Sequence, residues 1–125
     1  MADTFFSMFS PEEIALISAS GTRVTLPEGW APISESTGAD KAYIILNGTV
    51  SVRSHGEEVA QLGPGDIVGE AAILNHSLRT ATIVALTRLE LIHFSKEQLE
   101  KLSVEMPSFH EALERTAAER FPQES

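Results

Sequence analysis

The most informative segment of the chain runs from Gly63 to Leu74 and reads Gly-Pro-Gly-Asp-Ile-Val-Gly-Glu-Ala-Ala-Ile-Leu, followed by Leu-Arg-Thr-Ala-Thr-Ile at residues 78–83. Its first glycines and proline predict a tight turn. Gly69 has no Cβ, so the backbone there can come close to another group. Residues 70–74 suffice for one helical turn, whose first amides lack helical partners and would attract an anion.

A lone acid and a lone base in this segment indicate what the anion would carry. Arg79 can hold an anion with its planar fork of N–H donors. Glu70 would be repelled by that anion unless it accepts hydrogen bonds from neutral hydroxyl groups beside the charge. An anion and a hydroxyl on one small ligand indicate a ribose phosphate. The alternative is a surface ion pair between the two side chains with no ligand, and such pairs stabilise proteins little.

Residues 69–74 and 79–82 together resemble the phosphate-binding cassette of the cyclic nucleotide-binding domain family, and the likeness extends from about residue 9 to about residue 120. This family includes the catabolite activator protein, protein kinase regulatory subunits and cyclic nucleotide-gated channels. The resemblance implies that Glu70 contacts the ribose 2′-hydroxyl and that Arg79 contacts the cyclic phosphate.

The resemblance implies further ligand contacts within the cassette. Gly69, Ala71 and Ala72 would offer backbone amides and small side chains to the phosphate, although alanine also simply favours a short helical turn. Thr80 stands where relatives selective for cGMP contact guanine, and its other interpretation is a β-branched residue that opens a strand. No second guanine-reading feature accompanies it, so we expect cAMP as the ligand, with a cGMP-selective site as the alternative.

Two valines outside the cassette complete the expected site. Val52 and Val59 align with apolar strand residues that pack on the nucleotide base in the family. Packing in the interior between strands is the alternative interpretation of both residues.

The pattern of short strands between turns predicts a mainly β domain with flanking helices. We expect strands over residues 23–26, 41–46, 49–53, 58–62, 80–86 and 89–94. Many short strands at regular spacing favour a jelly-roll-like β-barrel closed by double-sheet pairing, which is also the fold that the resemblance implies. The expected organisation is one domain over 1–125, made of an N-terminal helical segment (1–20), the barrel (21–94, with the cassette at 69–80) and two C-terminal helices (95–121).

Helix signals stand at both ends of the predicted barrel. Ser10 and Ser95 are candidate N-caps, the first followed by a proline and two acids. A third helix is expected over 108–120. The helices after Ser95 carry an apolar stripe made of Leu99, Leu102, Met106, Phe109 and Leu113. The resemblance implies that the last helix moves as a lid over the base.

The N-terminus is rich in large apolar residues, namely Phe5, Phe6, Met8 and Phe9. With the helix that follows, they are expected to cover one end of the barrel. Docking of a partner protein is the alternative, because four large apolar residues are many for a terminal segment.

Composition narrows the classes of function. The net charge of -9 and pI of about 4.8 argue against direct nucleic-acid binding, since phosphate backbones would be repelled. The chain has no cysteine, which agrees with a reducing compartment such as the cytoplasm, and no run of about 18 apolar residues for a membrane span. Its four histidines lack metal-ligand spacing, and no catalytic constellation is visible.

We therefore expect a non-enzymatic cyclic nucleotide sensor that binds its ligand through Glu70 and Arg79 and signals to a protein partner by moving its C-terminal helices. A ligand-free protein-interaction domain on the same barrel is the alternative from another class. The chain ends soon after the last helix, so a small stand-alone protein is expected, as a monomer or weak homodimer.

Overall fold

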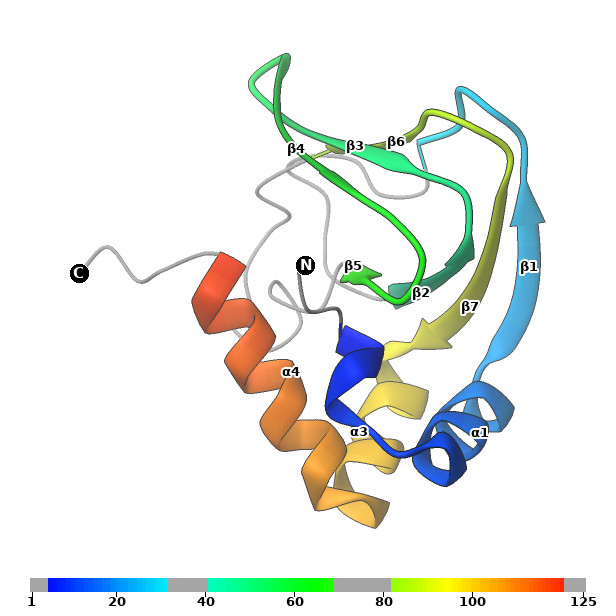
Figure 1. Ribbon diagram of the computed structural model, residues 1–125, viewed down its shortest axis with the longest axis vertical. Coiled ribbons are helices and arrows are strands. Elements are labelled where there is room, and N and C mark those ends of the chain that lie inside the picture. The colour runs from blue at the N-terminus through cyan, green and yellow to red at the C-terminus, as the bar shows by residue number, and fades with distance from the viewer. Residues whose placement is uncertain (1–4, 32–40, 69–81, 121–125) are drawn as a thin grey trace.

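The computed structural model describes residues 5–31, 41–68 and 82–120. The helices lie together at one end of the molecule and the strands at the other (Figure 1). In chain order the elements are η1 (Phe5–Met8), α1 (Pro11–Ser20), β1 (Thr22–Leu26), β2 (Lys41–Asn47), β3 (Val50–Ser54), β4 (Glu57–Leu62), β5 (Ile67–Val68), β6 (Thr82–Ala85), β7 (Leu89–Ser95), α3 (Lys96–Glu105) and α4 (Pro107–Arg120).

The strands form two antiparallel sheets, one ordered β1-β7-β2-β5 and the other β4-β3-β6. This confirms the predicted mainly β, jelly-roll-like fold. One detail of the prediction is wrong for the described ranges, because the two sheets are not hydrogen-bonded into a closed barrel. Among the described residues, the edge strands β1 and β5 of the first sheet do not pair with the edge strands β4 and β6 of the second.

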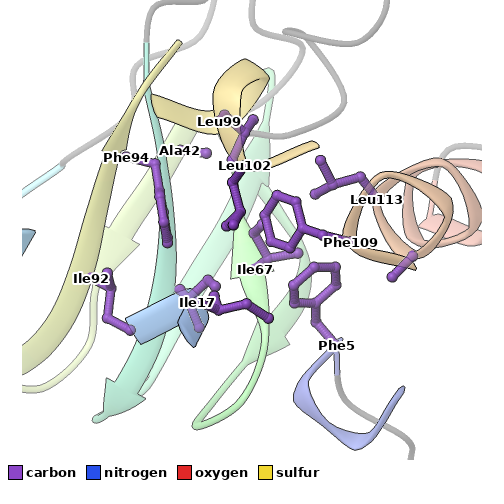
Figure 2. Packing of buried hydrophobic residues seen from close by; sticks show 12 residues of the cluster. Phe5, Ile17, Ala42, Ile67, Ile92, Phe94, Leu99, Leu102, Phe109 and Leu113 are labelled. Atoms are coloured by element: carbon purple, nitrogen blue, oxygen red, sulfur yellow. The ribbon is translucent and has the colours of Figure 1, made fainter. Parts of the chain in front are cut away.

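The central strands of the first sheet, β2 and β7, are largely buried on both faces, and side chains along β2 alternate between two cores as strand geometry requires. Ala42 and Ile44 face the helix-side core, whereas Tyr43 and Ile45 face the sheet-side core between the two sheets. The helix-side core consists of Phe5, Ile17, Ala42, Ile44, Ile67, Ile92, Phe94, Leu99, Leu102, Phe109, Ala112 and Leu113 (Figure 2). The sheet-side core consists of Tyr43, Ile45, Val50, Val52, Val68, Ile83, Ala85, Leu89 and Leu91.

Both predicted N-caps are confirmed. Ser10 accepts from the Glu13 backbone N–H at 3.2 Å while the Glu13 carboxylate accepts from the Ser10 N–H at 2.9 Å. Ser95 and Gln98 make the same reciprocal pair at the start of α3, with both distances at or below 3.0 Å. Such capping boxes satisfy backbone donors that the first helical turn leaves without partners.

The N-terminal apolar residues cover the helix-side core, as predicted, rather than standing free for a partner. Phe5 is 2% exposed, and its ring meets Phe109 of α4 edge-on at a centroid distance of 5.6 Å (Figure 2). The Phe6 backbone N–H also donates to the Gly65 carbonyl at 3.0 Å, in the turn between β4 and β5. The N-terminal segment therefore contacts both α4 and the turn that leads toward the cassette.

Replacement of Gly48 by alanine is expected to destabilise the domain more than the same change at Gly56. Both glycines have a positive φ, +99° and +86°, which alanine adopts only with strain of about 1 kcal/mol or more. At Gly48 the new Cβ would also lie 2.5 Å from the Arg88 carbonyl oxygen and 2.8 Å from Leu89 Cδ2, whereas nothing lies within 4 Å at Gly56. Urea unfolding of both variants measures the difference. Equal losses would show that the turn at 87–89 moves away freely.

Acid is expected to remove a stabilising contact at Glu13. The Ser10 backbone N–H, and after it the Ser108 hydroxyl at 3.1 Å, hold the pKa of Glu13 below its ordinary 4.5. A carboxyl whose folded pKa is lowered stabilises the fold above its unfolded pKa, and loses that contribution as pH falls through the folded value. Glu13→Gln should therefore lower the melting temperature at pH 7, and the gap to the parent should close below about pH 4.5.

Glu12→Gln is the matched control, since Glu12 lies in the same helical turn and has no hydrogen-bond partner among the described residues. If Glu12→Gln lowers the melting temperature by the same amount and with the same pH dependence, the assigned contact of Glu13 is wrong. The effect would then come only from a negative charge near the helix N-terminus.

Candidate functional site

The predicted cassette residues Gly69, Glu70, Ala71, Ala72, Arg79 and Thr80 lie outside the described residues, so their roles stay predictions. The structure does describe both flanks. Ile67 and Val68 form β5, paired with β2 in the first sheet, and Thr82 opens β6, paired with β3 in the second. Segment 69–81 therefore connects the two sheets, and Gly69 directly follows a residue of the sheet-side core.

The inner face of β3 and β4 forms one described wall beside these flanks. Val52 is 6% exposed within the sheet-side core, and the register places Ala60 directly opposite it. Opposed residues of an antiparallel pair share a face, so Ala60 also faces inward. Ala60 is nevertheless exposed, which means that the inner face is open at this point.

The two predicted base-contacting valines are placed differently. Val52 lies on the inner wall, where core packing already occupies it. Val59 sits at a register shift in β4 and is 62% exposed. Sequence reasoning missed Ala60, because the extra residue in β4 changes which side chain opposes Val52. A regular strand pairing would place Val59, not Ala60, opposite Val52, so the sequence alone does not indicate Ala60.

A row of three polar side chains, continued by the apolar Val68, crosses the inner face of the first sheet. The register aligns Thr22, His93, Tyr43 and Val68 across β1, β7, β2 and β5. The Tyr43 and His93 rings meet edge-on, with centroids 5.4 Å apart, and Tyr43 is 7% exposed. Neither residue was a predicted site residue. The alternation of β2 could have placed Tyr43 inward, but its proximity to Val68 required the strand pairing.

The described residues of the open wall and of the row at Tyr43 carry no permanent positive charge. Among the inner-face residues described here, Tyr43, Val52, Ala60 and Val68 are uncharged, and His93 is a cation only when protonated. A phosphate bound beside these residues would therefore need charge from elsewhere, and Arg79 in segment 69–81 is the predicted source. Within the described residues no group of three or more His, Asp or Glu side chains could hold a metal ion. No described helix has the length and apolar character needed to cross a membrane.

A family model described as "Cyclic nucleotide-binding domain" matches residues 23–105, well over half of the chain. The chain belongs to this family. The matched range contains both sheets apart from the first residue of β1, and it also contains Glu70, Arg79 and α3, so the resemblance noted for the cassette extends to most of the chain.

Individual relatives of this cyclic nucleotide-binding domain are regulatory proteins. The chain is 25% identical over 120 residues to a "CRP-like cAMP-activated global transcriptional regulator" of Mycobacterium tuberculosis, covering 92% of this chain and 54% of that protein. It is 36% identical over 95 residues to a "cAMP-dependent protein kinase regulatory subunit" of Yarrowia lipolytica, covering 74% of this chain and 25% of that protein. Among solved structures, the catabolite activator protein of Thermus thermophilus superposes with a TM-score of 0.82 at 28% identity, covering 93% of this chain and 57% of that one. The domain thus spans about half, or less, of the length of these relatives.

Proposed function

We propose that this domain is a sensor that binds cAMP between its two sheets and passes the signal to a protein partner. The observation that carries the proposal is the family match over 23–105, in a chain that retains both an acid and an arginine at cassette positions 70 and 79. The open inner wall at Ala60 on one sheet and the row of side chains that meets Val68 on the other support a ligand between the two sheets. The names of the M. tuberculosis and Y. lipolytica relatives make cAMP the first ligand to test.

Calorimetric titration of the full chain tests the proposal. We expect saturable one-to-one binding of cAMP, weaker binding of cGMP, and no comparable binding of 5′-AMP, which lacks the ring-closed phosphate. Tighter binding of cGMP than of cAMP would mean that the proposed site is right but the proposed nucleobase is wrong. Absence of binding by both cyclic nucleotides would favour the ligand-free interaction domain. Chromatography of the recovered ligand checks that the protein acts as a binder and not as a phosphodiesterase.

The proposed output is a movement of α4, and the structure limits where it can occur. The stripe residues Leu99, Leu102, Phe109 and Leu113 are each no more than 3% exposed, which is deeper burial than a loosely docked lid predicts. Thr116 is 6% exposed, and its hydroxyl has no hydrogen-bond partner among the described residues. A buried polar group without a partner costs about 1–3 kcal/mol, so the second half of α4 is the better candidate to move.

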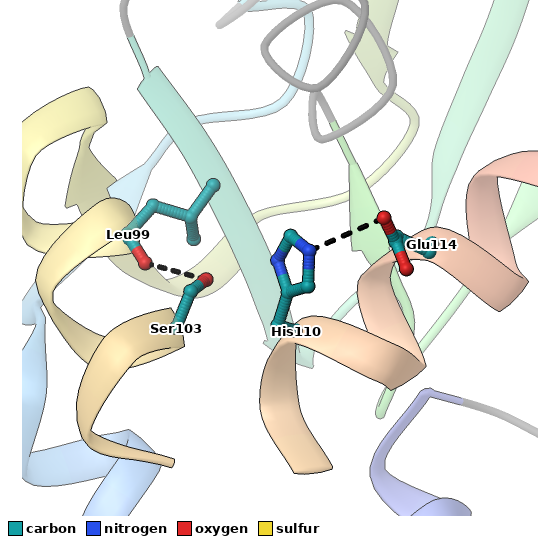
Figure 3. Close-up of polar contacts among 4 residues, drawn as sticks. All are labelled: Leu99, Ser103, His110 and Glu114. Carbon is teal, nitrogen blue, oxygen red and sulfur yellow. Dashed lines mark hydrogen bonds and ion pairs between the residues drawn. The ribbon is translucent and has the colours of Figure 1, made fainter. Parts of the chain in front are cut away.

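Hydrogen exchange with and without cAMP is expected to change at the cassette and at residues 107–120, with the larger change after Leu113. The physical reason is that ligand contact can shift a two-state equilibrium only where the free energy holding one state is small. The same range of α4 holds the exposed ion pair between His110 Nε2 and Glu114 Oε2, which lie 3.2 Å apart (Figure 3). A change confined to the cassette would leave a static binder without this output.

We further propose that the domain is a monomer or weak dimer. The inward face of α4 is used in the helix-side core, while Glu111, Glu114 and Arg115 on its other faces are exposed. Charged side chains give an interface little apolar area to bury. Sedimentation at low micromolar concentration measures the state, and a tight dimer would overturn this part.

A further inference from the structure

Four side chains on the outer face of β3 and β4 are joined by hydrogen bonds, and none of them belongs to the proposed site. The Ser51 hydroxyl donates to Glu58 Oε1 at 2.6 Å and accepts from Arg53 Nε at 3.1 Å. Gln61 Nε2 donates to Glu58 Oε2 at 3.2 Å. Ser51 is 0% exposed, so its hydroxyl is fully buried beneath its partners. We call Ser51, Arg53, Glu58 and Gln61 the outer-face network.

The outer-face network spans an irregularity in the sheet. Val52 pairs with Ala60, but the next residue, Arg53, pairs with Glu58, so β4 has one residue more than β3 between these pairs. The extra residue is Val59, which makes this a β-bulge. Side chains three positions apart in a regular strand point to opposite faces. The direct contact between Glu58 and Gln61 therefore depends on the bulge.

These contacts favour the ionised form of the Glu58 carboxylate. The Ser51 hydroxyl, then the Gln61 amide, and to a smaller degree the Arg53 charge, lower the pKa of Glu58. The carboxylate thus stays charged at neutral pH and accepts from two neighbours, one on β3 and one beyond the bulge on β4. Hydrogen bonds to an ionised group are the stronger kind.

The opposite side of the same bulge is the open wall of the candidate site. Val59 is the bulged residue and is 62% exposed, and Ala60, the next residue, faces inward opposite Val52. Bulges bend a strand and re-aim the side chains beside them. The hydrogen bonds of Glu58 on the outer face stabilise the bulge. They therefore also determine which side chains of β4 face inward.

We propose that the outer-face network is a positioning device that holds the Val59 bulge and thereby sets how the domain discriminates between nucleobases. This inference rests on the proposed function, because the wall is assigned to the base of a bound cyclic nucleotide. Ser51 and Glu58 act through Val59 and Ala60 and do not contact the ligand themselves. The ribose and phosphate are bound elsewhere, so their contribution is common to all cyclic nucleotides.

The test uses Ser51→Ala in the full chain, with Ser103→Ala as the matched control. Ser103 also donates one hydrogen bond, to the Leu99 carbonyl at 2.9 Å, but it lies in α3 (Figure 3). Calorimetry gives the ratio of the dissociation constants for cAMP and for 3′,5′-cyclic uridine monophosphate. We expect Ser51→Ala to reduce this discrimination by about tenfold, the scale of one lost apolar contact in a pocket, and Ser103→Ala to leave it unchanged.

A ligand-free measurement separates this inference from the proposed function. Cross-strand NMR contacts between Val52 and Ala60, and between Arg53 and Glu58, report the bulge directly, and Ser51→Ala should weaken the second pair. Deletion of Val59 is the second variant. It should leave both pairs and the fold in place as a regular ladder and still reduce discrimination.

Each outcome decides a different point. If Ser51→Ala keeps both contacts and the parent ratio, the network does not hold the bulge. If the bulge relaxes, or Val59 is deleted, and the ratio is unchanged, the bulge does not set base discrimination. If the parent protein binds neither cyclic nucleotide, the proposed function and the role of the wall fail together, while the NMR contacts still decide whether the network holds the bulge.

Discussion

Replacement of Arg79 by alanine is expected to weaken cAMP binding at least tens-fold. Tyr43, Val52, Ala60 and Val68 on the described inner faces carry no charge, so without Arg79 the phosphate would lose its predicted charged partner within a domain of net charge -9. Loss of one partner of a desolvated charge pair typically costs about 2–5 kcal/mol, and each 1.4 kcal/mol is about tenfold in affinity. Calorimetry with cAMP measures the effect. An unchanged dissociation constant would remove Arg79 from the site.

Glu70→Ala provides the comparison within the same cassette. Its expected partner is a neutral ribose hydroxyl, so the loss should be smaller than for Arg79, and the preference for ribose over 2′-deoxyribose ligands should narrow. A larger loss than for Arg79 would mean that the two roles are assigned wrongly. Lys101→Ala, an exposed change in α3, controls for the general effect of removing one positive charge.

Replacement of Phe109 by alanine is expected to cost about 3–5 kcal/mol of unfolding free energy, the range for buried phenylalanines. Phe109 is 0% exposed, and its ring lies 5.6 Å from Phe5, 6.3 Å from Phe9 and 6.4 Å from Phe94. It therefore joins the N-terminal segment, the first sheet and α4 in one aromatic cluster (Figure 2). Small domains have only about 5–15 kcal/mol of stability in total, so this one contact is a large share.

Urea unfolding of Phe109→Ala and Phe109→Leu measures the effect, and the leucine variant should fold even where the alanine variant does not. Phe6→Ala is the control, because Phe6 is only half-buried and packs at the border of the same core. Equal midpoints for Phe109→Ala and Phe6→Ala would show that the aromatic cluster is not a central contact. That outcome would also make a movement of the whole of α4, and not only of its second half, a candidate for the output.

Local signals in the sequence were sufficient for most elements of the fold. The capping boxes at Ser10 and Ser95 and the turn at Gly48 depend on residues within a few positions of each other, so their interpretation needed no tertiary contact. Strand alternation likewise predicted six of the strands within a few residues of their bounds. β5 was missed because two residues carry no periodicity, and it exists only through pairing with Tyr43 and Ile44.

In the candidate site, too, some residues could be predicted from local sequence and others only from tertiary contacts. Glu70 and Arg79 could be predicted from the chain because the cassette is one continuous segment with a specific resemblance, and they remain predictions. The sequence by itself also determined the class of fold and the acidic charge that leaves Arg79 as the expected source of positive charge. Only the tertiary structure decided that Ala60 opposes Val52, that Val59 is an extra residue, and that Phe109 packs on Phe5. The physical reason is that strand register and core packing arise from contacts between residues far apart in the chain, where a shift of one residue exchanges the two faces of a strand.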